Sequence, residues 1–227
     1  MLILILTANK IFFKLKSIDW TKAKGIISFN LADINVTINT NDTVGLILQA
    51  WLKEYLNKNN ILFREPSNTQ EFPDFFLSHS NIENLLEIKS FNFSKSPTFD
   101  IANFDSYCDS IKENPYRLDA DYIIFGYDME KTGIITIKDI WLKKIWEIAG
   151  TSKKYPLKTQ VKRNIIYNIR PNTAFKNYNA SPFKSREQFI HAIYETLLVY
   201  KGSKFVYNWL NIFSINYKAY YNAEFKI

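Results

Sequence analysis

The stretch DYIIFGYD at residues 121–128 is almost continuously apolar between its acidic ends. A strand with one face in water alternates apolar and polar residues, whereas a strand covered on both faces has no need to. We therefore expect residues 121–128 to form a central strand of a sheet with helices packed on it. The segment GIITIKDIW at residues 133–141 predicts a further strand directly after it. A chain built around such a strand has an α/β fold.

An amphipathic helix is predicted before this strand. Residues 41–43, NDT, are of the types that cap helix N-termini, and VGLILQAWLKEYLNKN follows at residues 44–59. Apolar residues recur there at the i, i+3, i+4, i+7 spacing of one helix face: Val44, Ile47, Leu48, Trp51 and Tyr55.

Short apolar segments between the helix and the central strand predict three more strands. They are ILF at residues 61–63, DFFL at 74–77 and NLLEIKSF at 84–91, and the last two are expected to form a hairpin around the turn-like SHSN. A second helix is expected through DIANFDSYCDSI, capped by Ser96 or Thr98. The predicted order is helix, three short strands, helix, strand, strand.

The two ends of the chain carry weaker signals. The first six residues, MLILIL, predict a buried strand, and residues 26–39 predict one or two strands because they are rich in Ile and Val. KRNIIYNIR at residues 162–170 predicts another strand. A last helix is expected to begin at Ser185 and to close at Gly202. No Pro/Gly-rich linker interrupts the chain, so we expect a single domain over residues 1–227.

The composition excludes several classes of protein. With 47% hydrophobic and 16% aromatic residues, the chain can bury a large core and is not disordered. One cysteine, Cys108, and two distant histidines, His79 and His191, exclude a disulfide framework and a Cys/His metal cluster. The apolar run at the N-terminus is too short for a signal peptide or a membrane span. We expect a soluble protein of the reducing cytoplasm.

The charge is unevenly distributed along the chain. Residues 1–130 hold 12 basic and 17 acidic side chains, whereas residues 131–227 hold 17 basic and 5 acidic ones. A basic C-terminal part on an aromatic-rich chain favours binding to a polyanion, although a solvated lysine surface would have the same composition.

Three charged residues in the predicted hairpin have a spacing with chemical meaning. Side chains at i and i+2 of a strand share one face, so Glu87 and Lys89 project together. If DFFL pairs beside that strand, Asp74 lies next to Glu87. Two carboxylates this close repel each other unless a hard cation such as Mg²⁺ bridges them. Such an ion activates water and stabilises charge on phosphate oxygens, and Lys89 can orient the water, so the group favours phosphodiester hydrolysis.

Two alternatives stay open for these carboxylates. Asp74 can instead cap a turn while Glu87 and Lys89 form an ordinary surface ion pair, worth less than about 1 kcal/mol. Glu54, which borders the apolar face of the first helix, is either an accessory metal ligand or a solvated charge.

The sequence resembles the PD-(D/E)xK nuclease superfamily through Pro73, Asp74, Glu87, Ile88 and Lys89. Within it, the chain is most similar to the NgoBV/NlaIV-like family of type II restriction endonucleases. The similar stretches cover about residues 42–172 and include NTQEFPDFFL, LLEIKSF, FDIANFDSY, PYRLDADYIIFGY, WLKKIWEI and PLKTQVKRNIIYNIRP.

This resemblance implies a restriction-endonuclease-like αβββαβ core, in which a mixed central sheet is flanked by helices. The catalytic core would span residues 41–140, and residues 141–227 would form a basic, DNA-binding C-terminal extension. The resemblance also implies Mg²⁺-dependent cleavage of double-stranded DNA with 5′-phosphate ends at a short palindrome of the GGNNCC type. A homodimer and a cognate DNA methyltransferase are the expected partners. Asp74, Glu87 and Lys89 match the motif, and Glu54 rests on its position in the first helix.

The basic region supplies candidates for DNA binding. Lysines there are expected to bind phosphates, arginines to contact guanine, and amides to read adenine or fix the register. The candidates are Lys158, Gln160, Lys162, Arg163, Asn164, Asn168, Arg170, Asn172 and Lys176, with Gln70 beside the motif as a contact to the backbone at the cut.

Two other functions stay open. A repair or junction nuclease of the same superfamily would bind DNA structure instead of sequence. A non-catalytic nucleic-acid-binding protein would carry the charges at positions 74, 87 and 89 without using them.

Overall fold

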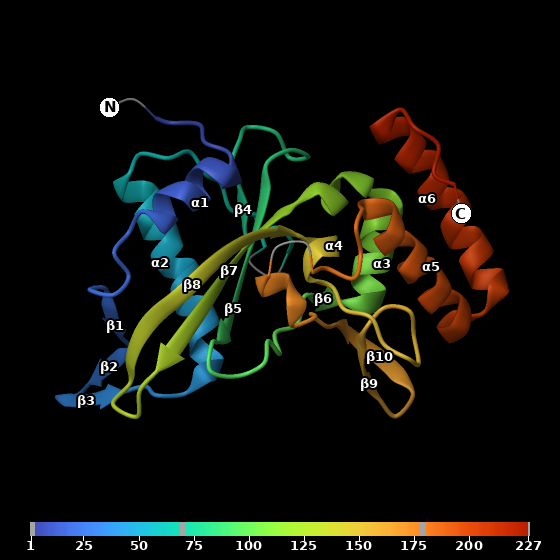
Figure 1. The fold of residues 1–227 in the computed structure, drawn as a ribbon. Coiled ribbons are helices and arrows are strands. Elements are labelled where there is room, and N and C mark those ends of the chain that lie inside the picture. Colours follow the sequence, from blue (N-terminus) through green and yellow to red (C-terminus); the bar gives the residue numbers. More distant parts are fainter. Residues whose placement is uncertain (1–2, 69–70, 178–179, 227) are drawn as a thin grey trace. The chain divides into compact units, whose positions relative to one another are not determined.

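The computed structural model describes residues 3–68, 71–177 and 180–226. The chain is α/β, as expected, and its contacts divide it into two compact units. The first unit contains Met1–Pro97 and Asp121–Leu142, and the second contains Thr98–Ala120 and Lys143–Ile227. Each unit holds a sheet of its own and helices packed against it (Figure 1).

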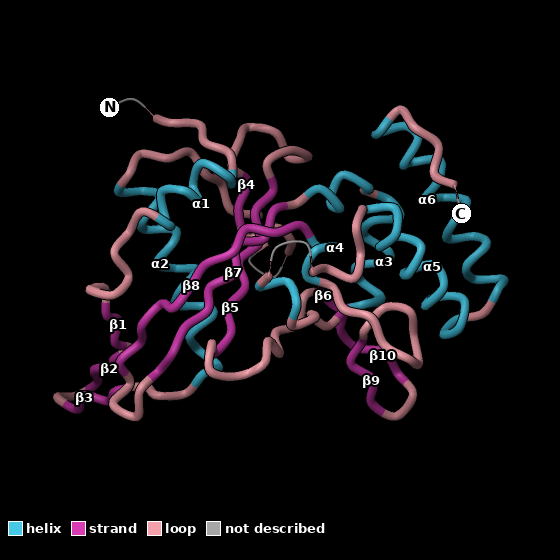
Figure 2. Tube along the Cα trace, viewed as in Figure 1, coloured by secondary structure: helices cyan, strands magenta, loops and turns pink. Residues whose placement is uncertain are grey.

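The first unit is built on a five-stranded sheet in the order β1-β8-β7-β5-β4. Its strands are β1 (Lys24–Ile26), β4 (Phe75–Phe76), β5 (Leu85–Asn92), β7 (Asp121–Met129) and β8 (Ile134–Lys144). Strand β7 is parallel to β5, and β4 is antiparallel to β5, so the sheet is mixed. Figure 2 shows the strands of this sheet in magenta. The central strand and the β4–β5 hairpin predicted from the sequence are confirmed.

Strand β7 shows why a nearly unbroken apolar run was needed. Every residue from Tyr122 to Tyr127 is buried, because both faces of the strand are covered. Position 126 leaves no room for a side chain, because a Cβ on Gly126 would lie 2.9 Å from atoms of Phe93 and Trp141.

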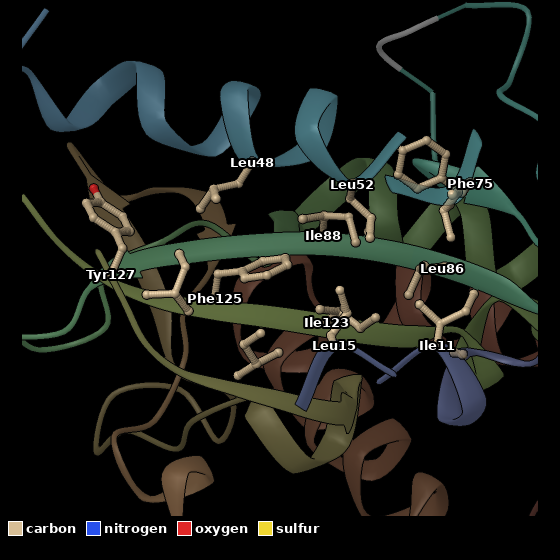
Figure 3. Close-up of a cluster of buried hydrophobic side chains, with 14 of the residues drawn as sticks. Ile11, Leu15, Leu48, Leu52, Phe75, Leu86, Ile88, Ile123, Phe125 and Tyr127 are labelled. Carbon is tan, nitrogen blue, oxygen red and sulfur yellow. The ribbon is translucent and has the colours of Figure 1, made fainter. Parts of the chain in front are cut away.

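Two helices bury their apolar stripes in the core of the first unit. They are α1 (Ala8–Lys16) and α2 (Val44–Lys58), and a short 3₁₀ turn, η1 (Asn41–Thr43), leads into α2. The buried residues of α2 recur every four positions, at 44, 48, 52 and 56. Figure 3 shows Leu48 and Leu52 directed toward Ile88 of β5, with Ile11 and Leu15 of α1 in the same cluster. The predicted first helix is confirmed within one residue.

Residues 26–39 form two strands, within the one or two that the sequence predicted. Ile26 ends β1, and β2 (Ser28–Leu31) and β3 (Ile34–Thr37) form a separate two-stranded sheet, called here the β2–β3 ribbon. Ala32 and Asp33 between the strands both have positive φ angles, of 47° and 65°, as a two-residue hairpin loop requires.

Two predicted strands are wrong. The segment at residues 1–6 is not a buried strand in its described part, because Ile3 and Ile5 are 63% and 59% exposed and only Leu4 makes a β-bridge, to Ile61. Residues 61–63 likewise form no strand. A strand needs a partner along several residues, and the apolar runs here find one for a single residue.

The second unit has a three-stranded sheet in the order β6-β10-β9 and a group of helices. Its strands are β6 (Ala102–Asn103), β9 (Thr159–Lys162) and β10 (Ile165–Ile169). Its helical segments are α3 (Phe104–Glu113), η2 (Pro115–Asp119), α4 (Ile145–Ile148), η3 (Ala174–Lys176), α5 (Arg186–Lys201) and α6 (Ser203–Tyr221).

Helix α3 begins later than predicted. Its cap is Asn103, whose side chain accepts the Ser106 N–H at 3.0 Å, and neither Ser96 nor Thr98 caps it. Residues 102–103 pair with β10 instead of joining the helix. Cys108 is buried in α3, and the Trp209 indole of α6 donates to its carbonyl at 2.9 Å.

Helix α5 starts and stops where the sequence predicts. The Ser185 hydroxyl accepts the Gln188 N–H, and Gly202 follows the last residue with a φ of 84°. At its start, Arg186 makes an ion pair with Asp119 at 2.8 Å and covers the ring of Tyr221. Burial and the neighbouring Asp119 charge raise the pKa of the Tyr221 hydroxyl, which donates to that carboxylate. The Arg186 cluster thereby ties α5, α6 and η2 together.

Within the described ranges, no helix is both long and apolar enough to cross a membrane.

Candidate active site

The register of the β4–β5 hairpin brings Asp74 and Glu87 together. Phe75 pairs with Leu86 and Phe76 with Leu85, so the next position along places Asp74 opposite Glu87. Phe75 and Leu86 are fully buried in the core, which fixes the face to which the alternate residues turn. Glu87 and Lys89 therefore share the face opposite to that of Leu86 and Ile88.

Short contacts join the three predicted residues into one group. The Asp74 N–H donates to Glu87 Oε2 at 3.2 Å, and the Lys89 ammonium donates to Glu87 Oε1 at 3.0 Å. The Ile88 N–H donates to Asp74 Oδ2 at 2.6 Å. The side chains of Lys89 and Glu87 are 19% and 13% exposed, so this is not the ordinary surface ion pair of the alternative interpretation.

The environment of Asp74 disfavours its charged form. Burial, followed by the nearby charge of Glu87, raises the pKa of Asp74 from 3.8 to about 7. The Ile88 N–H and the Lys89 charge act in the opposite direction but do not compensate. A carboxyl pair held in this way is a place where additional positive charge is stabilising.

Gln49 is the residue of helix α2 that reaches this group. Its Nε2 donates to Asp74 Oδ1 at 2.8 Å, so both carboxylate oxygens of Asp74 have a donor. Gln49 is not among the site residues predicted from the sequence, which on this helix include only Glu54. Its position directly after the buried Leu48 was the available signal, since that position borders the face turned to the sheet.

Glu54 is not brought to the group. Its side chain is exposed on α2 and accepts a hydrogen bond from the Asn57 amide at 3.4 Å. Among residues 3–68, 71–177 and 180–226, no three His, Cys, Asp or Glu side chains gather closely enough to hold a metal ion by themselves.

The donor set nevertheless fits one hard divalent cation. Mg²⁺ binds through one or two carboxylates and completes its shell with water and substrate phosphate, so it needs no cage of three acidic residues. Asp74 and Glu87 supply two carboxylates, and burial beside Glu87 raises the pKa of Asp74 to about 7.

The candidates for DNA binding in the second unit fall into two sets. The first set lies at the tip of the β9–β10 hairpin, where Lys162, Arg163 and Asn164 are exposed. Arg163 and Asn164 have positive φ angles of 50° and 63° and form the two-residue loop between the paired Lys162 and Ile165. Their side chains are therefore presented on a tight turn.

In the strands below the tip, Gln160 and Asn168 contact each other, since the Asn168 amide donates to Gln160 Oε1 at 3.0 Å.

The second set has its donor groups engaged within the protein. Lys158 donates to the Pro171 carbonyl at 2.9 Å, and the Asn172 amide donates to the Ile148 and Ala149 carbonyls at 2.9 and 2.8 Å. Arg170 pairs with Asp100 at 2.7 Å and also donates to the Thr98 carbonyl.

Two further residues were predicted to bind DNA. Lys176 is half-buried at the end of η3. Gln70, expected at the cut site, lies outside the described residues.

Known restriction enzymes are similar to this chain in sequence. The sequence model of the NgoBV restriction endonuclease family matches residues 5–227. The type II restriction enzyme NlaIV of Neisseria lactamica is 42% identical over 231 residues, which cover 98% of this chain and 93% of that protein. The type II restriction enzyme NgoBV of Neisseria gonorrhoeae is 40% identical over 162 residues, 70% of this chain and 91% of that protein.

A solved structure shows the same fold. The NlaIV restriction endonuclease superposes with a TM-score of 0.89 at 40% identity, over 100% of this chain and 94% of that one. The fold class and the family resemblance are thus confirmed. The chain belongs to the NgoBV restriction endonuclease family and is a restriction enzyme of type II.

Proposed function

We propose that this enzyme cleaves double-stranded DNA by Mg²⁺-dependent phosphodiester hydrolysis at a short palindromic site. The observation that carries the proposal is the contact group of Asp74, Glu87 and Lys89 on one edge of the sheet. Asp74 and Glu87 would hold the ion, which when bound supplies a Lewis acid for the phosphate and a lowered pKa for water.

The residues of the chain have distinct roles in the proposed reaction. Glu87 holds the Lys89 ammonium on the face that both share, where it can orient the attacking water and balance the charge that grows on the phosphate oxygens. The water oxygen forms a new bond to phosphorus while the bond from phosphorus to the 3′ oxygen breaks. The products are a 5′-phosphate and a 3′-hydroxyl.

Gln49 acts in this proposal as a positioning residue. With the Ile88 N–H, it fixes the orientation of the Asp74 carboxylate. Such outer contacts tune the affinity of a metal site, typically by 10- to 100-fold. An amide in this position orients the ligand without adding a third negative charge to a pair that already repels.

Sequence reading is proposed for the tip of the β9–β10 hairpin. Arg163 offers a fork of donors that matches the two acceptors of guanine in the major groove, and Asn164 matches adenine. Lys162 would contact the backbone. For Lys158, Arg170 and Asn172 we propose a supporting role, because their donors already hold backbone carbonyls or Asp100. A site of the GGNNCC type is the proposed target.

The proposed partners follow from the reaction. Cleavage of both strands at a two-fold-symmetric site favours a homodimer, because each chain carries one such contact group among its described residues. A sequence-specific nuclease also requires a cognate DNA methyltransferase to protect the host genome, and both would act in the cytoplasm, where that DNA lies.

The proposal is tested by digestion of a sequenced plasmid with Mg²⁺, with EDTA, and with the Glu87→Ala variant. We expect discrete fragments with 5′-phosphate ends from the wild type with Mg²⁺ alone. Glu83→Ala is a matched control, because Glu83 is an exposed carboxylate just before the same strand and should leave cutting unchanged.

Two results would argue against this proposal. Cutting only at branched or damaged DNA would indicate a structure-specific nuclease. Equal activity of Glu87→Ala and the wild type would show that the contact group is not the catalytic centre.

A further inference from the structure

A groove of about 540 Å³, called here the polar groove, lies in the first unit where strand β5 ends. It is lined by side chains from residues 39–41, from residues 92–95, and from the turn between β7 and β8. Apart from Met129, the described side chains that line it are polar or charged. Pockets for small organic ligands are mostly apolar, so this lining suits a polar or charged ligand instead.

The amide groups of the polar groove are oriented by hydrogen bonds within the protein. Asn41 Oδ1 accepts from the Tyr127 hydroxyl at 3.3 Å and from Asn92 Nδ2 at 3.4 Å. Asn92 Oδ1 in turn accepts the Ser94 N–H at 3.1 Å and the Ser94 hydroxyl at 2.6 Å. The oxygens of both amides are thus used inside the protein, whereas the Asn41 Nδ2 donor has no partner among the described residues.

Two lysines add positive charge to the polar groove. Lys95 and Lys131 are exposed, and neither ammonium has an ion pair or hydrogen bond within the described ranges. Glu130, which also lines the groove, accepts the Thr132 hydroxyl at 3.2 Å. Because residues 1–130 are acidic as a whole, a generally basic surface does not explain the two lysines. The polar groove therefore offers unused donors and two cations to an anion.

The polar groove is held in shape by the backbone around it. The Phe93 N–H donates to the Tyr127 carbonyl at 2.6 Å, which fixes the segment after β5 beside β7. The Gly133 N–H donates to the Glu130 carbonyl at 2.9 Å and closes the turn between β7 and β8. This turn lies against the β2–β3 ribbon, because a Cβ on Gly133 would come within 2.5 Å of Thr37 Cγ2. A site formed in advance loses little conformational freedom when it binds a ligand.

We propose that the polar groove binds a phosphate of the DNA backbone at a distance from the bond that is cut. A phosphodiester is an anion whose oxygens accept hydrogen bonds from lysine and amide donors, which are the groups that this groove leaves unused. DNA is also the polyanion that a type II restriction enzyme meets. Such a contact adds affinity and fixes the register of the duplex but reads no sequence.

Strand β5 sets the distance between the polar groove and the proposed catalytic group, and this step rests on the proposed function. Lys89 and Asn92 are three residues apart on β5, which is about 10 Å along a strand. The DNA duplex advances about 3.4 Å for each base pair, so this distance corresponds to roughly three base pairs. The bound phosphate would therefore lie near the edge of a site of the GGNNCC type.

The test measures how salt weakens DNA binding, by fluorescence anisotropy without metal and on a duplex of arbitrary sequence. Lys95→Ala/Lys131→Ala removes both cations of the polar groove, and Asn41→Asp keeps an acceptor oxygen but replaces the unused donor by a charged oxygen. Lys10→Ala/Lys58→Ala is the matched control, because it removes two exposed lysines from α1 and α2 of the same unit. Far-ultraviolet circular dichroism and melting temperature establish that each variant is folded.

We expect the slope of log K against log salt to become shallower by about one in Lys95→Ala/Lys131→Ala and to stay unchanged in the control. Asn41→Asp should weaken binding about 10-fold at low salt and less at high salt. An unchanged slope in the lysine variant would overturn the proposal. An equal change in the control would also overturn it, because the effect would then belong to the overall charge. Since no cleavage occurs in this measurement, failure of the proposed reaction would not affect its outcome.

A methylphosphonate linkage, which carries no charge, locates the phosphate on cognate DNA. One such linkage is placed at successive positions of the duplex. We expect the wild type to bind about 10-fold more weakly when the linkage lies roughly three base pairs from the cut, whereas Lys95→Ala/Lys131→Ala should be insensitive to the same replacement. Equal sensitivity of both proteins at every position would contradict the assignment of that phosphate to the polar groove.

Discussion

Asp74 lies in surroundings that disfavour its charged form in the free protein. Its two oxygens receive Gln49 and the Ile88 N–H, yet its pKa is about 7 because it is buried beside Glu87. Residues arranged in this way lower stability to gain function, and their replacement separates the two effects.

Replacement of Asp74 by Asn should stabilise the metal-free protein above neutral pH. The folded pKa of about 7 exceeds the ordinary value of 3.8, so the folded chain binds the proton more tightly and wild-type stability falls as pH rises from about 4 to 7. Asn stays neutral, can still accept from Ile88, and can donate to Gln49 if that amide turns. We expect a gain on the order of 2 kcal/mol at pH 8 and a much smaller one at pH 5.

Thermal unfolding in EDTA at both pH values measures this gain, and Glu83→Gln is the control for loss of an exposed carboxylate. The variant should at the same time lose DNA cleavage and stabilisation by Mg²⁺. A variant that is less stable at pH 8 than the wild type would contradict the interpretation of Asp74.

A pair of substitutions on α2 decides which of its residues serves the site. Gln49→Leu removes the donor to Asp74, and we expect Mg²⁺ affinity and cleavage to fall by about 10- to 100-fold, with a shifted pH profile of cleavage. Glu54→Leu removes an exposed carboxylate on the same helix and should change neither by more than about twofold. Calorimetric titration with Mg²⁺ reports the affinity without DNA, and equal losses in both variants would argue against a specific role of Gln49.

The candidate site shows what sequence patterns can and cannot locate. Alternation along β5 was enough to place Glu87 and Lys89 on one face, and the short turn was enough to place Asp74 beside them. The contribution of α2 was not predictable in the same way. Whether Gln49 or Glu54 reaches the sheet depends on the rotation of the helix about its axis, which the packing of Leu48 and Leu52 on β5 decides.

At the scale of elements, the sequence predicted a helix whose ends carry capping residues and missed a helix that is held by packing alone. Helix α5 has Ser185 at its start and Gly202 at its end, and both were recognised. Helix α6 was missed. Its sequence is rich in aromatic and β-branched residues, which favour strands, and its N-terminus has no side-chain cap. It is helical because Val206, Trp209, Phe213 and Tyr217 bury one stripe.

The tip of the β9–β10 hairpin allows loss of a contact to be separated from loss of fold. Arg163 has a φ of 50°, which is equally strained for arginine and alanine but relaxed for glycine. Both Arg163→Ala and Arg163→Gly should lower DNA affinity about 10-fold, while Gly should raise the melting temperature relative to Ala. Fluorescence anisotropy in a Glu87→Ala background measures the affinity.

The salt dependence of the same measurement distinguishes two kinds of contact. If Arg163 binds a phosphate, the slope of log K against log salt should decrease by about one. If Arg163 contacts guanine, discrimination between cognate and altered sites should be lost instead. Unchanged affinity in both Arg163 variants would remove the hairpin tip from the DNA interface.

At the scale of the whole molecule, sequence patterns predict burial along one strand but not contacts between residues that are far apart in the chain. The apolar run of β7 predicted a strand covered on both faces. This was right, because burial on both faces requires apolar residues at consecutive positions. No local sequence pattern predicts that α3 packs against α6. This packing depends on contacts such as that from Trp209 to the Cys108 carbonyl, between residues about a hundred positions apart.

That same contact places the only thiol of the chain inside the second unit. Burial, reinforced by Asp105 and Asp109, raises the pKa of Cys108, so the native protein should contain almost no reactive thiolate. We expect a thiol reagent to modify native enzyme at least 1000-fold more slowly than enzyme unfolded in urea, and mass spectrometry to count one label per chain. Stoichiometric labelling without urea would contradict this burial. The rate at which Cys108 is labelled therefore reports how often the second unit opens, because a reagent reaches the buried thiol only when that unit opens.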